Sequence, residues 1–185
     1  GSQTLYRANY TPGQDSTIVP MAVGVLHTMN TTTEIQGLAF NANTNTLYGF
    51  HGETGSIGFY RITGSNGLCT LMNLVDDTDF SAMDYNPVDG FYYGVNNAPS
   101  SPALPDGPGL YRIDGVGSGV LSFNLLASLP PGSSRIDGLA AGPDTLYLMN
   151  GIESADIIPY SLITNSYGSA MPSPLMGMDA VLGGA

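Results

Sequence analysis

The sequence predicts an all-β fold, a β-propeller of about four blades. Short apolar runs recur along the chain, turn-forming residues separate them, and the same pattern of runs repeats three times. No segment keeps a helical periodicity over a useful length. Four strands per unit at a period of about 40 to 50 residues are typical of propeller blades. The 185 residues therefore indicate a single domain, 1–185.

Aligned motifs divide the chain into repeats at approximately 34–78, 79–134 and 135–176. The first strands are expected at 35–40, 80–85 and 136–141. The fourth strands are expected at 68–75, 120–129 and, with a weaker pattern, 168–172. The second repeat is longer because it carries an insert rich in Ser, Pro and Gly, Asn97–Pro108. Without this insert the three repeats have nearly the same length.

The two ends of the chain also match the repeat. Residues 5–8 align with the third strands and 17–26 with the fourth, whereas 178–181 align with the first. These matches predict a shared blade, 3–33 plus 177–185, in which no second strand is evident. Three explanations stay open: a truncated chain, closure through a three-stranded blade, or a strand supplied by another copy. The last would make a homo-oligomer by edge-strand pairing.

Composition excludes several classes of partner. The formal charge is −11, and the only bases are four arginines, with no lysine. Such a chain repels phosphate backbones and anionic lipids, so nucleic-acid binding and electrostatic membrane recruitment are not expected. No run approaches the roughly 20 apolar residues that span a bilayer, so membrane insertion is not expected either.

An extracellular location is expected from the acidic, lysine-free composition rich in Ser, Thr, Asn and Gly. Two sequons, at Asn9 and Asn30, are candidate glycosylation sites. The single cysteine, Cys69, cannot form a disulfide within the chain. We therefore expect a secreted or cell-surface protein that is stabilised without disulfides.

Two stretches of the second repeat, AMDYNPVDGFYYGV (82–95) and LYRID (110–114), resemble the repeats of known proteins. They are similar to secreted, largely uncharacterised β-propeller domains of cell-surface and adhesin-like microbial proteins. The resemblance extends over nearly the whole chain as repeats. It implies a propeller fold and a place at the cell surface, but its motifs specify blade structure and no activity.

Polar residues recur where the innermost strand of each blade begins. Gln36, Ser81, Asp137 and Asp179 share one repeat position, and Glu34, Asp79 and Arg135 flank it. A propeller would gather these side chains at one mouth of its central channel, where they are candidate ligand-binding residues. Carboxylates brought together repel one another or recruit a hard cation, so Asp79, Asp137 and Asp179 are candidate Ca²⁺ ligands. The alternative is a hydrogen-bonded ring that caps the strand ends.

A second aligned set follows the second strand of each repeat: His51, Asn96 and Asn150. These residues are further candidates for ligand binding. Because two of the three are asparagines, a role in capping turns is favoured over catalysis.

Two tyrosine positions also recur, at 6, 60, 111 and 160 in third strands and at 48, 93 and 147 in second strands. Alternate side chains of a strand share a face, so each set should occupy equivalent sites in every blade. We expect the rings to pack between adjacent blades, with hydroxyls that reach backbone groups. A ring of sugar-stacking platforms is the alternative.

The sequence favours a non-enzymatic binding or adhesion module that recognises a glycan or protein ligand on one propeller face. Residues 97–109 are the most distinctive contact loop on such a face. No catalytic motif is evident, and no catalytic residue is assigned. One alternative is a glycan hydrolase or lyase with Asp137, Asp179 and Glu34 as acid and base groups. Another is a structural subunit that assembles through its incomplete blade.

Overall fold

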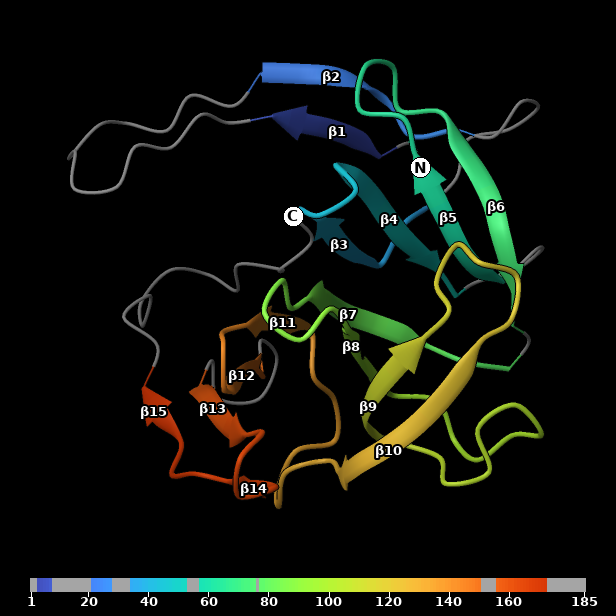
Figure 1. Cartoon of the computed structure of the whole chain (residues 1–185). Helices are drawn as coiled ribbons and strands as arrows, with labels where there is room; N and C mark the ends of the chain where they lie inside the picture. Colours follow the sequence, from blue (N-terminus) through green and yellow to red (C-terminus); the bar gives the residue numbers. More distant parts are fainter. Residues whose placement is uncertain are drawn as a thin grey trace, which may run out of the picture.

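The computed structural model of the chain describes residues 3–7, 21–27, 34–52, 57–75, 77–150 and 156–172. Within these ranges every regular element is a β-strand, and four antiparallel sheets follow one another in chain order (Figure 1). The expected all-β fold of four-stranded antiparallel repeats is therefore confirmed. The same ranges hold no helix long and apolar enough to cross a membrane.

Blades one and two are meanders in which each strand pairs with its neighbour in sequence. Blade one comprises β3 (Gly37–Asn41), β4 (Thr46–His51), β5 (Gly58–Ile62) and β6 (Cys69–Leu74). Blade two comprises β7 (Phe80–Tyr85), β8 (Tyr92–Asn96), β9 (Gly109–Asp114) and β10 (Ser122–Ser128). Each sheet lies within one repeat of the sequence, and the insert connects β8 to β9.

Blade three has a divided outer strand. Its inner strands are β11 (Gly138–Ala141), β12 (Thr145–Met149) and β13 (Asp156–Ser161). Two short strands, β14 (Ser166–Tyr167) and β15 (Met171–Pro172), both pair with β13. Pro159 lies in β13 opposite the break, where its carbonyl accepts a hydrogen bond from the Gly168 amide (2.8 Å). Its nitrogen has no proton to donate, which interrupts the outer strand at this point.

A smaller sheet precedes blade one. Strands β1 (Thr4–Arg7) and β2 (Met21–Val25) pair antiparallel and are called here the N-terminal sheet. They occupy segments that the sequence assigned to the third and fourth strands of the shared blade. The expected first strand of that blade, 178–181, lies outside the described residues. The shared blade therefore stays a prediction.

The sheets fan around a common axis with their first strands innermost (Figure 1). Strand β3 packs beside β7, and β7 packs beside β11. This is the radial arrangement of propeller blades. The N-terminal sheet lies next to blade one, and its two strands do not pack substantially against β11, β12 or β13.

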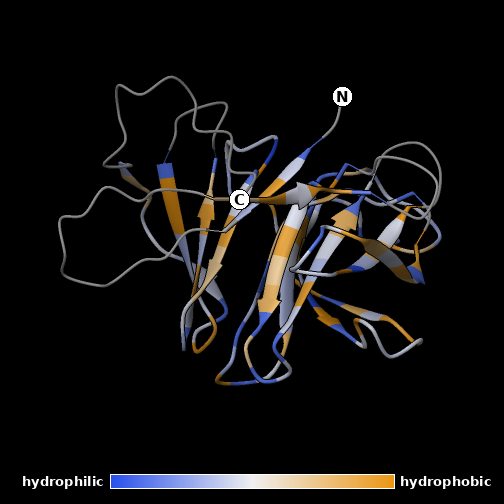
Figure 2. Ribbon diagram, turned by 90° about the horizontal axis from the view of Figure 1, so that it is seen from above, coloured by the Kyte–Doolittle hydropathy of each residue, from blue (hydrophilic) through white to orange (hydrophobic). Residues whose placement is uncertain are grey.

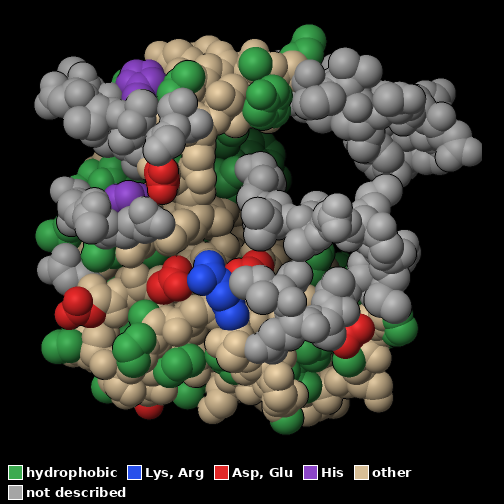
Figure 3. Space-filling view, turned by 180° about the vertical axis from the view of Figure 1, so that it is seen from behind, with side chains coloured by type: hydrophobic (Ala, Val, Ile, Leu, Met, Phe, Trp, Pro, Cys, Tyr) green, Lys and Arg blue, Asp and Glu red, His purple; other side chains and the backbone are tan. Residues whose placement is uncertain are grey.

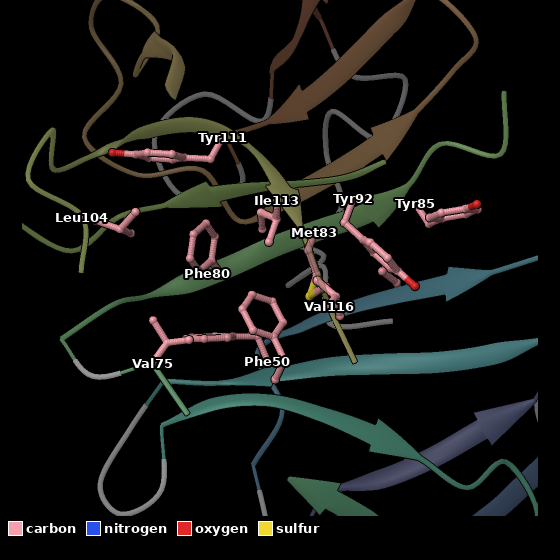
Figure 4. Close-up of a cluster of buried hydrophobic side chains, with 12 residues drawn as sticks. Phe50, Val75, Phe80, Met83, Tyr85, Tyr92, Leu104, Tyr111, Ile113 and Val116 are labelled. Atoms are coloured by element: carbon pink, nitrogen blue, oxygen red, sulfur yellow. The ribbon is translucent and has the colours of Figure 1, made fainter. Parts of the chain in front are cut away.

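Three apolar clusters join successive sheets. Leu5 of the N-terminal sheet meets Tyr60 of blade one, and Phe50 of blade one meets Phe80 of blade two (Figure 4). Leu110 belongs to the third cluster, between blades two and three. Seen from above, apolar residues run along the strands, whereas many of the connecting segments are hydrophilic (Figure 2). The core is thus divided into layers between the blades.

Strand alternation decides which layer a side chain joins. We call the face of a sheet that points to the next sheet its forward face, and the opposite one its backward face. In β5, Phe59 lies on the forward face and Tyr60 on the backward face. In β9, Leu110 lies forward and Tyr111 backward. The third-strand tyrosines of blades one and two are therefore buried between blades.

Polar contacts reinforce the packing near the strand ends. Asn41 of β3 donates its Nδ2 hydrogen to the Tyr92 hydroxyl of β8 (2.7 Å). Asp84 of β7 accepts a hydrogen bond from the Ala141 amide of β11 at Oδ2 (2.8 Å). Each of these bonds links one blade to the next, so apolar layers and hydrogen bonds fix the same arrangement.

Phe80 occupies the centre of the layer between blades one and two. It is fully buried, and its ring centroid lies 5.4 Å from Phe50, 5.8 Å from Phe59 and 5.5 Å from Phe123. We expect Phe80→Ala to lower the free energy of unfolding by about 3–5 kcal/mol, because it leaves a cavity among these rings. Urea denaturation measures the change. Phe40→Ala is the control, since that ring is half exposed on β3; an equal loss in both variants would contradict the expectation.

Candidate functional site

The starts of the three inner strands bring aligned polar residues together. Gln36, Ser81 and Asp137 all line one cavity of about 290 Å³. Asp179, the fourth member of the set, lies outside the described residues. We call this end of the inner strands the channel mouth and define it by five residues: Gln36, Asp79, Ser81, Arg135 and Asp137.

The rest of the cavity wall is apolar. It comes from all three inner strands and from the forward face of blade three, through Leu38, Met83, Leu139, Tyr147, Met149 and Ile157. A ligand here would therefore meet polar groups at the mouth and hydrocarbon along the wall. This combination is typical of sites for small organic ligands.

Ser81 is held by its protein neighbours. Its hydroxyl donates to the Ile136 carbonyl (2.9 Å) and accepts a hydrogen bond from Asn97 Nδ2. Asn97 also bonds both backbone groups of Ile136, donating to the carbonyl (3.0 Å) and accepting from the amide (3.1 Å). These hydrogen bonds connect blade two to blade three. Ser81 therefore positions the blades. Its partner Asn97 was singled out in the sequence only as the first residue of the insert, not as a partner of Ser81.

Asp137 forms an ion pair at the mouth. Its Oδ1 lies 2.6 Å from Arg135 Nε, and the arginine is partly exposed whereas the aspartate is mostly buried. Figure 3 shows one basic side chain between acidic ones on this side of the molecule. The ion pair holds the Asp137 side chain in place through Oδ1, and the other carboxylate oxygen, Oδ2, takes no part in the pair.

Three buried oxygen atoms at the mouth have no hydrogen-bond donor within the described parts of the chain: Gln36 Oε1, Asp79 Oδ1 and Asp137 Oδ2. The Gln36 amide lies over Gly52, because a Cβ atom added there would come within 2.4 Å of Oε1. A buried acceptor without a donor costs about 1–3 kcal/mol. The mouth therefore contains three acceptors that the described chain leaves unused.

Burial also changes the pKa of the Asp79 carboxyl. Desolvation raises the pKa of this carboxyl, the positive charge of Arg135 lowers the pKa, and the negative charge of Asp137 raises it. Together these effects raise the pKa of Asp79 above its ordinary value. The two carboxylates and the guanidinium thus form one electrostatic group, which supports treating them as a single site.

A second cavity, of about 470 Å³, adjoins the mouth and shares Gln36 with the first. Asp77 and Asp79 line it on one side and residues 98–102 of the insert on the other. The insert therefore forms part of the rim, as a contact loop would.

The insert is anchored through Leu104 and Gly107 in its second half. Leu104 is buried in the layer between blades one and two, and its amide donates to the Ser101 hydroxyl (3.1 Å). The Gly107 carbonyl accepts hydrogen bonds from the Tyr111 hydroxyl (2.7 Å) and from Asn96 Nδ2 (3.1 Å). These contacts hold residues 98–102 at the rim of the second cavity.

The second aligned set makes local hydrogen bonds. Asn96 accepts at Oδ1 from the Asp79 amide (2.8 Å) and donates to the Ala98 carbonyl (3.0 Å). Asn150 Nδ2 lies 3.4 Å from Ser133 Oγ, and a ring nitrogen of His51 lies 2.6 Å from the Glu34 carbonyl oxygen. Asn96 thus shapes the mouth by fixing the backbone of Asp79.

Several candidates fall outside the described ranges: the sequons Asn9 and Asn30, and Asp179 of the candidate calcium set. Among residues that the structure does describe, no three His, Cys, Asp or Glu side chains are grouped so that they could hold a metal ion. Asp79 and Asp137 therefore lack a third described carboxylate, and a calcium site at the mouth stays a proposal.

No protein-family model and no curated protein matches the chain. Among solved structures, the chain is similar to one chain of "Crystal structure of Nidogen/Laminin Complex", with 12% sequence identity and a TM-score of 0.38 over 94% of each chain. The expected relation to secreted microbial cell-surface proteins stays a prediction.

The raised pKa of Asp79 makes protein stability depend on pH. A folded-state pKa above the unfolded value of about 3.9 means that the folded protein binds this proton more tightly, so stability falls as pH rises through the folded-state pKa. We expect Asp79→Asn to be more stable than the natural chain at pH 7, with the difference lost below about pH 3.9. Urea unfolding at both pH values measures this.

The control for that comparison is Asp144→Asn, which removes an exposed carboxylate from the turn between β11 and β12. It should change stability little at either pH. A lower stability of Asp79→Asn at pH 7 would show that the contact of Asp79 with Arg135 outweighs its burial.

Proposed function

We propose that the chain is a non-enzymatic binding module whose ligand site is the channel mouth, and that the ligand is a neutral glycan. The observation that carries this proposal is the set of three buried acceptor oxygens, on Gln36, Asp79 and Asp137, that lack donors in the described chain. Neighbouring sugar hydroxyls are donors suited to such acceptors. The apolar cavity wall suits the C–H faces of a sugar ring.

The negative charge of the protein limits the class of glycan that the mouth is expected to bind. The chain carries a net charge of −11, and the mouth adds two carboxylates to one guanidinium. This arrangement disfavours sulfated or uronic-acid-rich glycans by like-charge repulsion. Neutral or amino-sugar ligands fit the site better. The acidic, lysine-free composition also supports the proposal that the module works outside the cell.

A glycan array followed by calorimetric titration tests the proposal. We expect Gln36→Ala and Asp137→Asn each to weaken binding by about tenfold or more, because each removes an acceptor of the ligand. Asp144→Asn is the matched control, an aspartate in the β11–β12 turn at the other end of the inner strand. Thermal melting shows whether each variant is folded. A natural chain that binds no glycan would contradict the proposal.

The same experiments distinguish glycan binding from the two alternatives, a calcium site and a glycan-cleaving enzyme. Calcium, which prefers oxygen ligands, is included in one arm and removed by a chelator in the other. A melting temperature that rises with calcium concentration would identify the ion as a ligand of the folded state. Cleavage of the bound glycan would instead support the hydrolase or lyase alternative, with Asp137 and Glu34 as the described acid and base candidates.

A further inference from the structure

Successive sheets of this protein follow one packing rule. In each of the three successive pairs of sheets, the forward face of one sheet is covered by the backward face of the next, and the same repeat positions make each contact. Phe50 and Val95, aligned in the second strands, lie on forward faces and are fully buried. Tyr111 and Tyr160, aligned in the third strands, lie on backward faces and are also buried. The rule therefore predicts what should cover any given face.

Blade three has a forward face of the same kind. Strand register places Gly138, Met149, Ile157 and Met171 in one row across the sheet. The neighbouring row consists of Ala140, Tyr147 and Pro159. Neither row contains a charged or hydrogen-bonding side chain apart from the tyrosine hydroxyl.

Within the described residues, the side chains of this forward face are more exposed than those of its counterpart on blade two. Tyr147 is 42% exposed and Met171 is 43% exposed, whereas Tyr93, which occupies the position of Tyr147 in blade two, is 3% exposed. An exposed apolar face is a candidate interaction surface. Its composition matches that of a face that elsewhere in this chain is covered by another blade.

The N-terminal sheet has the complementary surface. Leu5 points forward into the cluster with blade one, so its neighbour Tyr6 lies on the backward face. Tyr6 occupies the repeat position of Tyr60, Tyr111 and Tyr160, yet it is 59% exposed. Val25, in register with Thr4 on the same face, is also exposed.

We propose that these two surfaces are the halves of one interface between copies of this chain: the backward face of the N-terminal sheet of one copy packs on the forward face of blade three of another. A second copy is the occupant that the packing rule specifies, because it supplies a third-strand tyrosine for the face where Tyr147 lies. Among the described residues of one chain, no buried apolar cluster joins the N-terminal sheet to blade three. The contact is head-to-tail, so it builds a closed ring or a filament.

Cysteine crosslinking between two different variants tests the proposal. One protein carries Tyr6→Cys and the other, with a mass tag, carries Tyr147→Cys; both contain Cys69→Ala to remove the natural thiol. After mixing and mild oxidation we expect the mixed disulfide in excess over either homodimer. Val88→Cys replaces Tyr147→Cys in the control, because that exposed side chain lies in the β7–β8 turn. Mixed crosslinks no more abundant than in the control would overturn the proposal.

A chain that carries both Tyr6→Cys and Tyr147→Cys distinguishes copies from self-closure. At high concentration we expect disulfide-linked multimers. A disulfide within single chains at all concentrations would overturn the proposal, because the two faces would then meet in one molecule.

Sedimentation of the natural chain gives a measurement without cysteines. We expect concentration-dependent association, weakened about thirtyfold by Tyr6→Glu, as for loss of a central aromatic anchor. Val88→Glu should leave the association unchanged. A natural chain that is monomeric at every concentration would contradict the interface. Glycan binding is measured on Tyr6→Glu in parallel, at a concentration at which the protein is monomeric. Because Tyr6 is not among the residues that line the ligand cavity, failure of this interface is distinguishable from failure of the ligand site.

Discussion

Face-to-face packing of apolar sheets is the interaction on which the rest of this structure depends. Phe59 and Tyr60 are adjacent in β5, and both are buried, but they belong to different apolar layers. A sheet that is apolar on both faces has no surface suited to water, so it is stable only between two others. A radial fan meets this requirement for each blade in turn. The fan also brings the first strands of the blades to the centre, and this determines where the polar residues at the starts of those strands lie.

The channel mouth is a consequence of that fan. Gln36, Ser81 and Asp137 converge because the strands that they begin converge. The hydrogen bonds at the mouth are distributed unevenly. Asn97 joins Ser81 to blade three, whereas Gln36 Oε1 and Asp137 Oδ2 have no donor in the described chain. Acceptors in this state reduce stability, and the raised pKa of Asp79 reflects the same burial. The site thus retains polar groups that packing alone would not favour.

The two-residue period of the strands made most of the fold predictable. Strand β7 covers the residues expected from the sequence, and the aligned third-strand tyrosines Tyr60, Tyr111 and Tyr160 are buried between sheets. In the second-strand set, Tyr93 is buried as expected, whereas Tyr147 is exposed. Side-chain partners at the mouth were not predictable, because they come from loops whose path no periodicity describes; Asn97 is the clearest case. The divided outer strand of blade three depends on Pro159, which is visible in the sequence. Its effect follows only from the side of β13 on which its nitrogen lies.

Tyr6 and Tyr147 show what a repeat leaves open, since it specifies the chemistry of a face but not the partner that covers it. Tyr147 and Met149 line the same cavity as Gln36 and Asp137. A second copy seated on blade three would therefore close one side of the ligand cavity. Linkage then requires that association change ligand affinity by the same factor by which ligand changes association. The two proposals share a wall but not their key residues, because Asp137 is outside the docking face and Tyr6 is on the opposite sheet.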